Sequence, residues 1–236
     1  ARASPRLSAE LLKMDVVDTL YQILTGVSAP RGEDNKVDNV VTMQALVHRP
    51  REQVYETLNV ICELLPAAED YSDALNQFDR LRVDTGPYSP VRSSSKAKET
   101  AEQRRQLLQS CKAELKRFAV VLFPTLTDAY SSTVNQGVRQ KVLLAQLKML
   151  QNIDADVIEE SIRNVPYASF LAAILSQKDH PTLVFYALQC AELLFVRLPS
   201  IYQYQFHREG VISQIMSIAE QPLSKEANNA PPPTGN

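Results

Sequence analysis

Three cysteines and three histidines are the residues of this chain best suited to nucleophilic, acid–base or metal chemistry. The cysteines are far apart and stand inside apolar patterns of helical spacing: Cys62, Cys111 and Cys190. The histidines are each isolated in sequence: His48, His180 and His207. No Cys-x-x-Cys pair and no Cys/His cluster with metal-ligand spacing occurs, so the sequence predicts neither a metal site nor a cofactor.

His180 and Cys190 each have a chemical and a structural interpretation. His180 could act as a general base, but it stands in the tripeptide DHP at the entry to a helix, and no nucleophile is near it in sequence. Cys190 could act as a nucleophile, but its apolar neighbours predict a small buried side chain. We therefore expect a helix-entry residue and a core residue.

Neither the acidic pairs of this chain nor a search for known catalytic motifs indicates an active site. Asp154 with Asp156, and Glu159 with Glu160, could serve acid–base catalysis, yet they stand where a helix is predicted to begin, and negative charge there suits the helix dipole. The chain contains no GxGxxG, HExxH or GxSxG sequence and no P-loop. We expect no complete catalytic site.

The composition is that of an ordinary folded protein from inside the cell. The 236 residues are 44% hydrophobic, and only 6 are glycine, which favours helices over sheets with glycine-rich turns. The net charge of -2 gives no overall attraction to nucleic acid or acidic membranes. Scattered cysteines indicate a reduced, cytoplasmic or nuclear setting, and no apolar run approaches the roughly 18 residues that span a bilayer. The start at Ala rather than Met suggests a piece of a longer polypeptide.

Apolar residues at steps of three and four predict helices over residues 9–24, 38–47, 50–65, 70–81 and 98–117. Gly26 and Pro66 are expected to end two of these helices, and Pro50 to open one. We predict helical repeats over residues 1–82, a flexible loop over 83–97, further repeats over 98–221 and a disordered tail over 222–236.

A repeat becomes visible when the sequence is shifted by 44 positions, which lays residues 123–150 over residues 167–194. The matched pairs are apolar or helix-entry positions: Leu126 with Phe170, Ala129 with Ala173, Gly137 with Pro181, Leu144 with Leu188, and Leu150 with Leu194. Ile212, Ile215 and Ile218 begin a third copy. Helical units with this period are typical of HEAT and armadillo arrays, so we predict an all-α armadillo/HEAT-like α-solenoid.

The two longest helices of the repeats are apolar on most sides, which requires neighbours on several sides. Phe195 is assigned to the apolar face of the second. Stacked repeats bury such faces and leave an extended surface that binds proteins or peptides. Polar positions on these helices are the candidate contacts: Arg139, Lys141, Lys148, Tyr186 and Gln189.

Residues 80–117 form a locally basic segment, with ten Lys or Arg against four Asp or Glu. This excess could bind phosphate groups or an acidic protein. Tyr88 is its one interleaved aromatic residue, so stacking on nucleic-acid bases is not supported, and a solvated helix beside a loop is the favoured interpretation. Ser89-Pro90 has the pattern of a proline-directed phosphorylation site.

The run IYQYQFHREGV is rich in aromatic residues. Tyr202 and Phe206 lie one helical turn apart, which favours packing in the core. Tyr204, His207 and Arg208 form the alternative, an exposed contact patch, because Tyr and Arg are enriched in protein interfaces.

Long stretches of the chain resemble one family. FPTLTDAYSSTVNQGVRQKVLLAQLKML and VPYASFLAAILSQKDHPTLVFYALQCAELLFVRLPSIYQYQFHREGV closely resemble the armadillo-type region of HECT-type E3 ubiquitin ligases of the ubiquitin fusion degradation class. DTLYQILTG and LVHRPREQVYETLNVICELLP extend the resemblance over most of residues 15–220. The sequence resembles those of fungal members, and the family includes an animal thyroid-hormone-receptor-interacting HECT ligase.

The resemblance implies a function without catalysis in this chain. In the family a C-terminal HECT domain carries the thioester-forming cysteine, and none of the three cysteines here matches its context. The armadillo-type region is implied to recruit substrates, including ubiquitin-bearing ones, and to hold them before the HECT domain. The implied partners are ubiquitin or a ubiquitinated substrate and the HECT domain of the same parent chain. The alternative is an adaptor that binds peptides or nucleic acid through the basic segment, although the charge of the whole chain does not favour nucleic acid. No membrane partner is expected.

Overall fold

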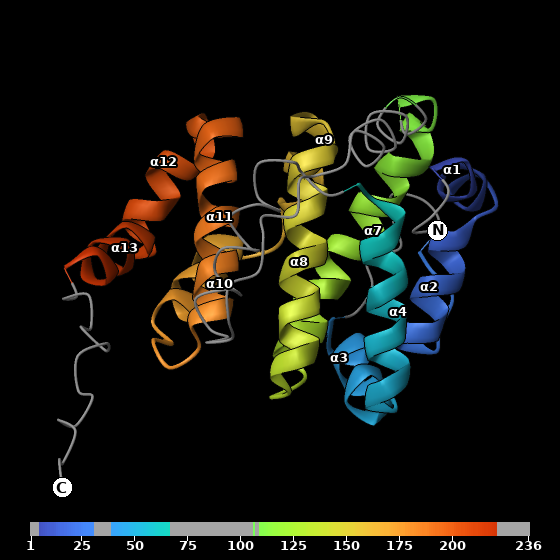
Figure 1. Cartoon of the computed structure of the whole chain (residues 1–236), viewed down its shortest axis with the longest axis horizontal. Coiled ribbons are helices and arrows are strands. Elements are labelled where there is room, and N and C mark those ends of the chain that lie inside the picture. The colour runs from blue at the N-terminus through green and yellow to red at the C-terminus, as the bar shows by residue number, and fades with distance from the viewer. Residues whose placement is uncertain (1–4, 31–38, 67–105, 107–108, 221–236) are drawn as a thin grey trace, which may run out of the picture.

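A computed structural model describes residues 5–30, 39–66, 106 and 109–220, and within these ranges it contains eleven α-helices and no strand (Figure 1). The helices of the N-terminal part are α1 (Pro5–Lys13), α2 (Val16–Thr25), α3 (Asn39–His48) and α4 (Arg51–Leu64). Those of the C-terminal part are α7 (Lys112–Ser131), α8 (Gln136–Asn152), α9 (Ala155–Ile162), α10 (Tyr167–Leu175), α11 (Pro181–Arg197), α12 (Pro199–Arg208) and α13 (Val211–Ala219). The predicted all-α fold is confirmed.

The helices repeat with the period that the sequence predicted. α9 and α12 begin 44 residues apart, and so do α10 and α13. α8 and α11 begin 45 residues apart and have the same length of 17 residues. The chain is therefore a solenoid of units of up to three helices, and the 44-residue match between its copies is confirmed.

α7 is a fusion of two repeat helices. Shifted by 44 positions, α9 and α10 fall on residues 111–118 and 123–131, and the single helix α7 (112–131) covers both ranges from residue 112 on. Pro166 separates α9 from α10, since the residue before a proline avoids the helical conformation; the matching position in α7 is Leu122, which is fully buried. α7 instead has Pro124 inside it. The predicted end of a helix at residue 117 is therefore wrong, because α7 continues to Ser131; residues 98–105 of that prediction lie outside the described residues.

The helix predicted over residues 9–24 is also divided. Asp15 adopts a left-handed backbone conformation, with φ 54° and ψ 34°, between α1 and α2. Asp tolerates this conformation better than most residues, but it is a weak signal compared with glycine. Gly26 does end α2 as predicted, with φ 78° and its N–H donating to the Gln22 carbonyl at 2.7 Å.

The last helices of successive repeat units, α4, α8 and α11, lie side by side. α8 packs between α4 and α11, and Figure 1 shows these three crossing the molecule in chain order. α7 packs against α8 and α9, and α10 packs against α11 and α13. The helices that precede the last helix of each unit, α7 and α10, therefore form a second layer, which α13 continues. One continuous core of buried side chains runs from Leu12 to Val211. The predicted helix over 70–81, the loop over 83–97 and the tail over 222–236 lie outside the described residues.

A buried hydrogen-bonded chain links α7, α8 and α10. Gln146, which has no exposed surface, donates from Nε2 to Thr127 Oγ1 at 2.9 Å. Its Oε1 accepts from the hydroxyl of Tyr167 at 3.1 Å, and Tyr167 is also fully buried. Because buried polar groups are costly without partners, these contacts fix the register of the three helices.

Candidate functional site

The cysteines lie in the core and are not poised for nucleophilic attack. Cys111 and Cys190 have no exposed surface and Cys62 is 3% exposed. Burial raises the pKa of Cys62 to about 11 and that of Cys190 to about 12, so both remain thiols at neutral pH. Within the described ranges, no group of three or more His, Cys, Asp and Glu residues is arranged to hold a metal ion.

His180 is the helix-entry residue that the sequence predicted. It is the N-cap of α11, and its ring Nδ1 lies 3.0 Å from Nε2 of Gln136, the residue one repeat earlier at the start of α8. Asp154 precedes α9 and lies 3.4 Å from the ammonium group of Lys112. These two side chains therefore connect repeats and do not converge on a reactive site.

A cleft of about 520 Å³ lies between the start of α7 and the junction of α8 with α9. Lys112, Lys116, Asp154 and Asp156 are the charged side chains that line it. Ion pairs from Lys112 to Asp154 and from Lys116 to Glu160 connect α7 to α9 beside it. The cleft thus has mixed and partly paired charge, and no nucleophile and base lie together in it.

The open side of α4, α8 and α11 contains two of the contact positions that the sequence analysis proposed, Lys141 and Lys148, and we name it the row face. Exposed or partly exposed positions recur along it every three or four residues on α8 and α11: Lys141, Leu144, Lys148, Gln151, Phe185, Leu188 and Glu192. On α4, Glu52, Glu56 and Val60 are exposed at the same four-residue spacing. The row face therefore mixes apolar, acidic and basic groups.

Lys148 on the row face binds the preceding repeat. Its ammonium group donates to the carbonyls of Cys62 at 2.6 Å and Leu65 at 3.4 Å, at the end of α4. Asn152 of α8 donates to the carbonyl of Pro66 at 3.2 Å. A helix end leaves carbonyls without intrahelical donors and carries partial negative charge, so a cation there is stabilising.

Arg197 repeats this arrangement one unit later. Its guanidinium donates to the carbonyl of Ile153 at 2.6 Å and to that of Leu150, at the end of α8. Burial lowers the pKa of this guanidinium without discharging it. The C-terminal ends of α4 and α8 are therefore each capped by side chains of the next long helix, α8 and α11 respectively.

Arg139 and Lys141 are also engaged within the stack. Arg139 Nε donates to the Thr133 carbonyl at 2.7 Å, and its guanidinium lies 4.8 Å from the centre of the Tyr130 ring. The ammonium of Lys141 lies 5.6 Å from the centre of the Tyr55 ring on α4. Both side chains are partly buried.

Tyr186 and Gln189 do not lie on an open surface. They are 5% and 6% exposed, because α11 is packed against both α8 and α10. The expectation that they offer contacts to a partner is therefore wrong. The opposite correction applies to Phe195, which was assigned to a buried face and is 39% exposed.

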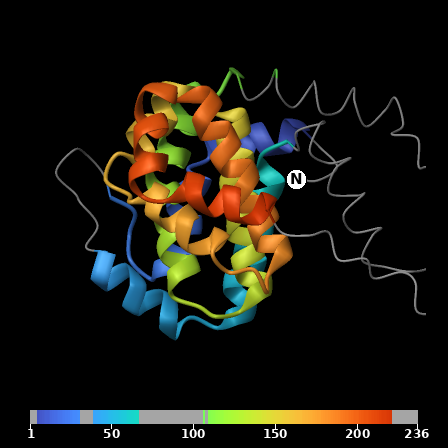
Figure 2. The same cartoon turned by 90° about the vertical axis from the view of Figure 1, so that its left-hand side faces the viewer.

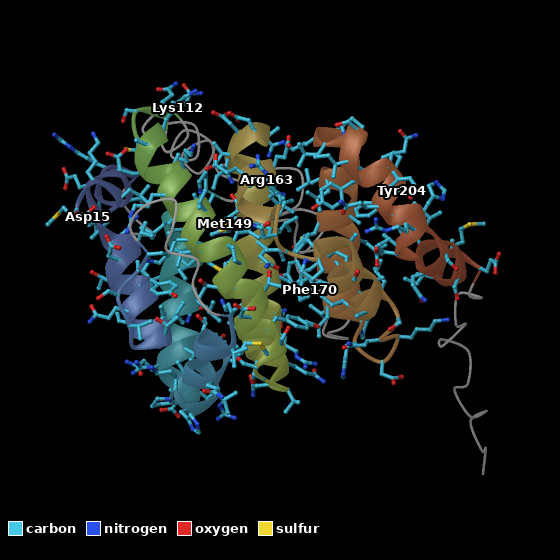
Figure 3. The ribbon with its side chains drawn as sticks, turned by 180° about the vertical axis from the view of Figure 1, so that it is seen from behind. Asp15, Lys112, Met149, Arg163, Phe170 and Tyr204 are labelled. Carbon is cyan, nitrogen blue, oxygen red and sulfur yellow. The ribbon has the colours of Figure 1, made fainter. Side chains whose placement is uncertain are left out.

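Three exposed residues of α12 form the surface that we name the α12 patch: Tyr204, His207 and Arg208. Tyr204, labelled in Figure 3, is 67% exposed, and the Arg208 guanidinium lies 5.8 Å from the centre of its ring. Tyr202 and Phe206 on the same helix are buried, as the packing interpretation predicted, whereas the role of the three exposed residues as partner contacts stays a prediction.

Glu209 anchors the α12 patch to α10. Its carboxylate accepts from the Ser169 hydroxyl at 2.6 Å and from Arg208 at 2.7 Å. These hydrogen bonds, that from Ser169 first, lower the pKa of Glu209, so it is ionised at neutral pH. Arg208 is thereby held beside Tyr204, and the patch presents an aromatic ring and a cation together.

The described cations of the basic segment are paired with acids. Lys112 and Lys116 form ion pairs with α9, and Arg117 binds Asp18 of α2. These pairs reduce the charge that this segment offers to phosphate groups. The remaining basic residues of 80–105 and Ser89 lie outside the described residues. None of the described helices is long and apolar enough to cross a membrane.

Comparison with known proteins reveals similar sequences in ubiquitin ligases. The chain is 27% identical to the E3 ubiquitin-protein ligase TRIP12 of Danio rerio, over 92% of the chain and 12% of the ligase. It is 29% identical to the E3 ubiquitin-protein ligase UPL3 of Arabidopsis thaliana, over 91% of the chain and 11% of that protein. It is 24% identical to a probable ubiquitin fusion degradation protein of Schizosaccharomyces pombe, over 91% of the chain and 11% of that protein.

These similarities confirm the resemblance inferred from the sequence. The chain matches, over nine-tenths of its length, a region of ubiquitin ligases and of a ubiquitin fusion degradation protein. It spans only 11% to 12% of the length of these relatives. No family model and no solved structure matches the chain.

Proposed function

We propose that this chain is a non-catalytic scaffold region of a HECT-type E3 ubiquitin ligase of the cytoplasm or nucleus, where it recruits ubiquitin or a ubiquitin-bearing substrate. The observation that carries the proposal is the similarity of nine-tenths of the chain to ubiquitin ligases and a ubiquitin fusion degradation protein. Because the similar region is 11% to 12% of each relative, we assign the transfer of ubiquitin to a HECT domain elsewhere in the parent polypeptide.

The state of the cysteines supports a role in binding. Formation of a ubiquitin thioester requires an accessible thiolate. All three cysteines are buried, and burial raises the pKa of both Cys62 and Cys190 far above neutrality. A partner could not reach these thiols without unfolding the core.

We assign partner binding first to the α12 patch. Tyr204 and Arg208 are exposed and held against each other, which lowers the entropy lost when they bind. Tyr and Arg contribute a large share of the binding energy at protein interfaces. Lys148 and Arg139, by contrast, already hydrogen-bond within the repeats, so they are less available to a partner.

The proposal is tested by titrating this chain into isotope-labelled ubiquitin, a linked ubiquitin dimer and a linear ubiquitin-fusion protein, with NMR detection. We expect saturable shifts with at least one of the three. Tyr204→Ala combined with Arg208→Ala should weaken that binding about tenfold or more. Arg163→Ala, an exposed change at the end of α9, is the matched control and should leave binding unchanged.

Two results would argue against the proposal. The absence of saturable shifts for all three probes up to about 1 mM would refute recruitment of ubiquitin by this chain. Equal loss of binding in Arg163→Ala and in the double variant would remove the assignment to the α12 patch.

A further inference from the structure

The C-terminal end of the stack exposes apolar positions that the preceding repeat buries. On α10, Ala168, Leu171 and Ile174 are 2%, 0% and 1% exposed. Forty-four residues later on α13 they correspond to isoleucines, which are only partly buried: Ile212, Ile215 and Ile218. The same residue class at the same repeat position is thus covered in one copy and open to water in the next.

Two further side chains extend this surface. Met216 of α13 is 58% exposed. On α11, Leu193 is partly exposed, although Met149 at the same position of α8 has no exposed surface. We name this set the end face: Leu193, Ile212, Ile215, Met216 and Ile218. Figure 2 looks onto this end of the molecule, where α12 and α13 lie in front of the other helices.

The structure indicates the kind of element that fits there. α11 packs against both α8 and α10, the third helix of the previous unit and the second helix of its own. The equivalent place, between α11 and α13, holds no helix among the described residues. The final unit of a finished solenoid has a polar outer side, whereas the end face is apolar. The end face therefore has the chemistry of a repeat junction.

We propose that the end face binds an amphipathic helix of the same polypeptide, supplied by a segment outside residues 1–236, which completes the third repeat. Residues 221–236 contain a single large apolar residue, Leu223, so their sequence lacks the required apolar stripe. The relatives are long enough to supply one, because the chain spans only 11% to 12% of their length. This proposal does not depend on ubiquitin binding.

The capping pattern specifies one property of that helix. Lys148 and Asn152 of α8 cap α4, and Arg197 of α11 caps α8. By the same geometry the added helix carries Lys, Arg or Asn near its C-terminal end, where it reaches the carbonyls of Leu194 and Arg197. Apolar residues along the rest of the helix cover Leu193 and the isoleucines of α13.

The buried native cysteines allow a direct test. Because all three are buried, Met216→Cys introduces a single accessible thiol, and Arg163→Cys provides a matched exposed control. Each variant is made in this 236-residue chain and in the full-length natural polypeptide, and alkylation of the introduced cysteine by iodoacetamide is timed by mass spectrometry of the peptide that contains it. Circular dichroism verifies that both variants remain helical.

In the 236-residue chain the two thiols should react at similar rates. In the full-length polypeptide the thiol at position 216 should react at about one-tenth of its rate in the 236-residue chain, or more slowly still. The reaction rate of the thiol at position 163 should be the same in both. Equal rates at the two positions in the full-length polypeptide would overturn the proposal. Protection of position 216 that appears in the 236-residue chain and grows with its concentration would also overturn it, since a second copy would then cover the end face.

Discussion

Replacing Asp128 by asparagine should raise the free energy of unfolding at neutral pH. Asp128 lies on α7 and is partly buried, and its carboxylate has no ion pair or hydrogen bond among the described residues. Burial raises its pKa to about 6. The carboxylate form is therefore destabilised in the folded chain, whereas an uncharged amide of similar size does not carry this cost.

The magnitude and sign follow from the pKa. A rise from an ordinary value of about 4 to about 6 corresponds to ~3 kcal/mol, and because water still reaches part of the side chain we expect ~1–2 kcal/mol. Between pH 4 and pH 6 the folded state binds more of this proton than the unfolded state, so the contribution of Asp128 to wild-type stability falls as pH rises through this window and is level above it.

Urea denaturation followed by circular dichroism at pH 4, 5, 6 and 7 measures this effect. Asp128→Asn should match the wild type near pH 4 and exceed it by about 1–2 kcal/mol at pH 7. Asp156→Asn, an exposed change in the first turn of α9, is the control and should not produce the same pH dependence. Equal stability of Asp128→Asn and wild type at pH 7 would refute the reasoning.

Two substitutions test how the repeats are joined. Arg197→Met removes the donors to the Leu150 and Ile153 carbonyls and should lower the free energy of unfolding in urea by about 1–3 kcal/mol. The exposed Arg163→Met should change it little, and equal losses of stability in the two variants would contradict the capping role. Tyr167→Phe leaves Gln146 Oε1 without its donor and should lower the thermal midpoint by a few degrees, corresponding to about 1–2 kcal/mol. An unchanged midpoint would show that the buried hydrogen bonds among Thr127, Gln146 and Tyr167 do not fix the register of the helices.

The repeat could be predicted because its contacts demand the same residue class at the same position. Leu150 and Leu194 are both 1% exposed, and each lies inside the third helix of its unit. Helix ends were predictable where the backbone requires a special residue, as at Gly26 with its positive φ and at Pro50 before α4. These signals act within a few residues along the chain.

The errors arose where distant contacts decide the structure. Tyr186 and Gln189 have polar groups, but packing of α11 between α8 and α10 buries both. Asp15 interrupts a helical pattern without a glycine or proline to mark the break. Lys148 has a side chain long enough to reach a carbonyl of another helix, and no pattern in the neighbouring sequence predicts that contact.

The capping contacts make stability and surface chemistry hard to separate in this fold. Lys148 and Arg197 are the type of residue that a sequence reader assigns to partner binding, yet each satisfies carbonyls of the preceding repeat. Because neighbouring repeats in a solenoid stabilise one another, removing such a side chain loosens the stack and weakens any partner surface built on it. A loss of binding on mutation of Lys148 would therefore be accompanied by a fall in the thermal midpoint, whereas a loss at Tyr204, which is exposed on α12, would not.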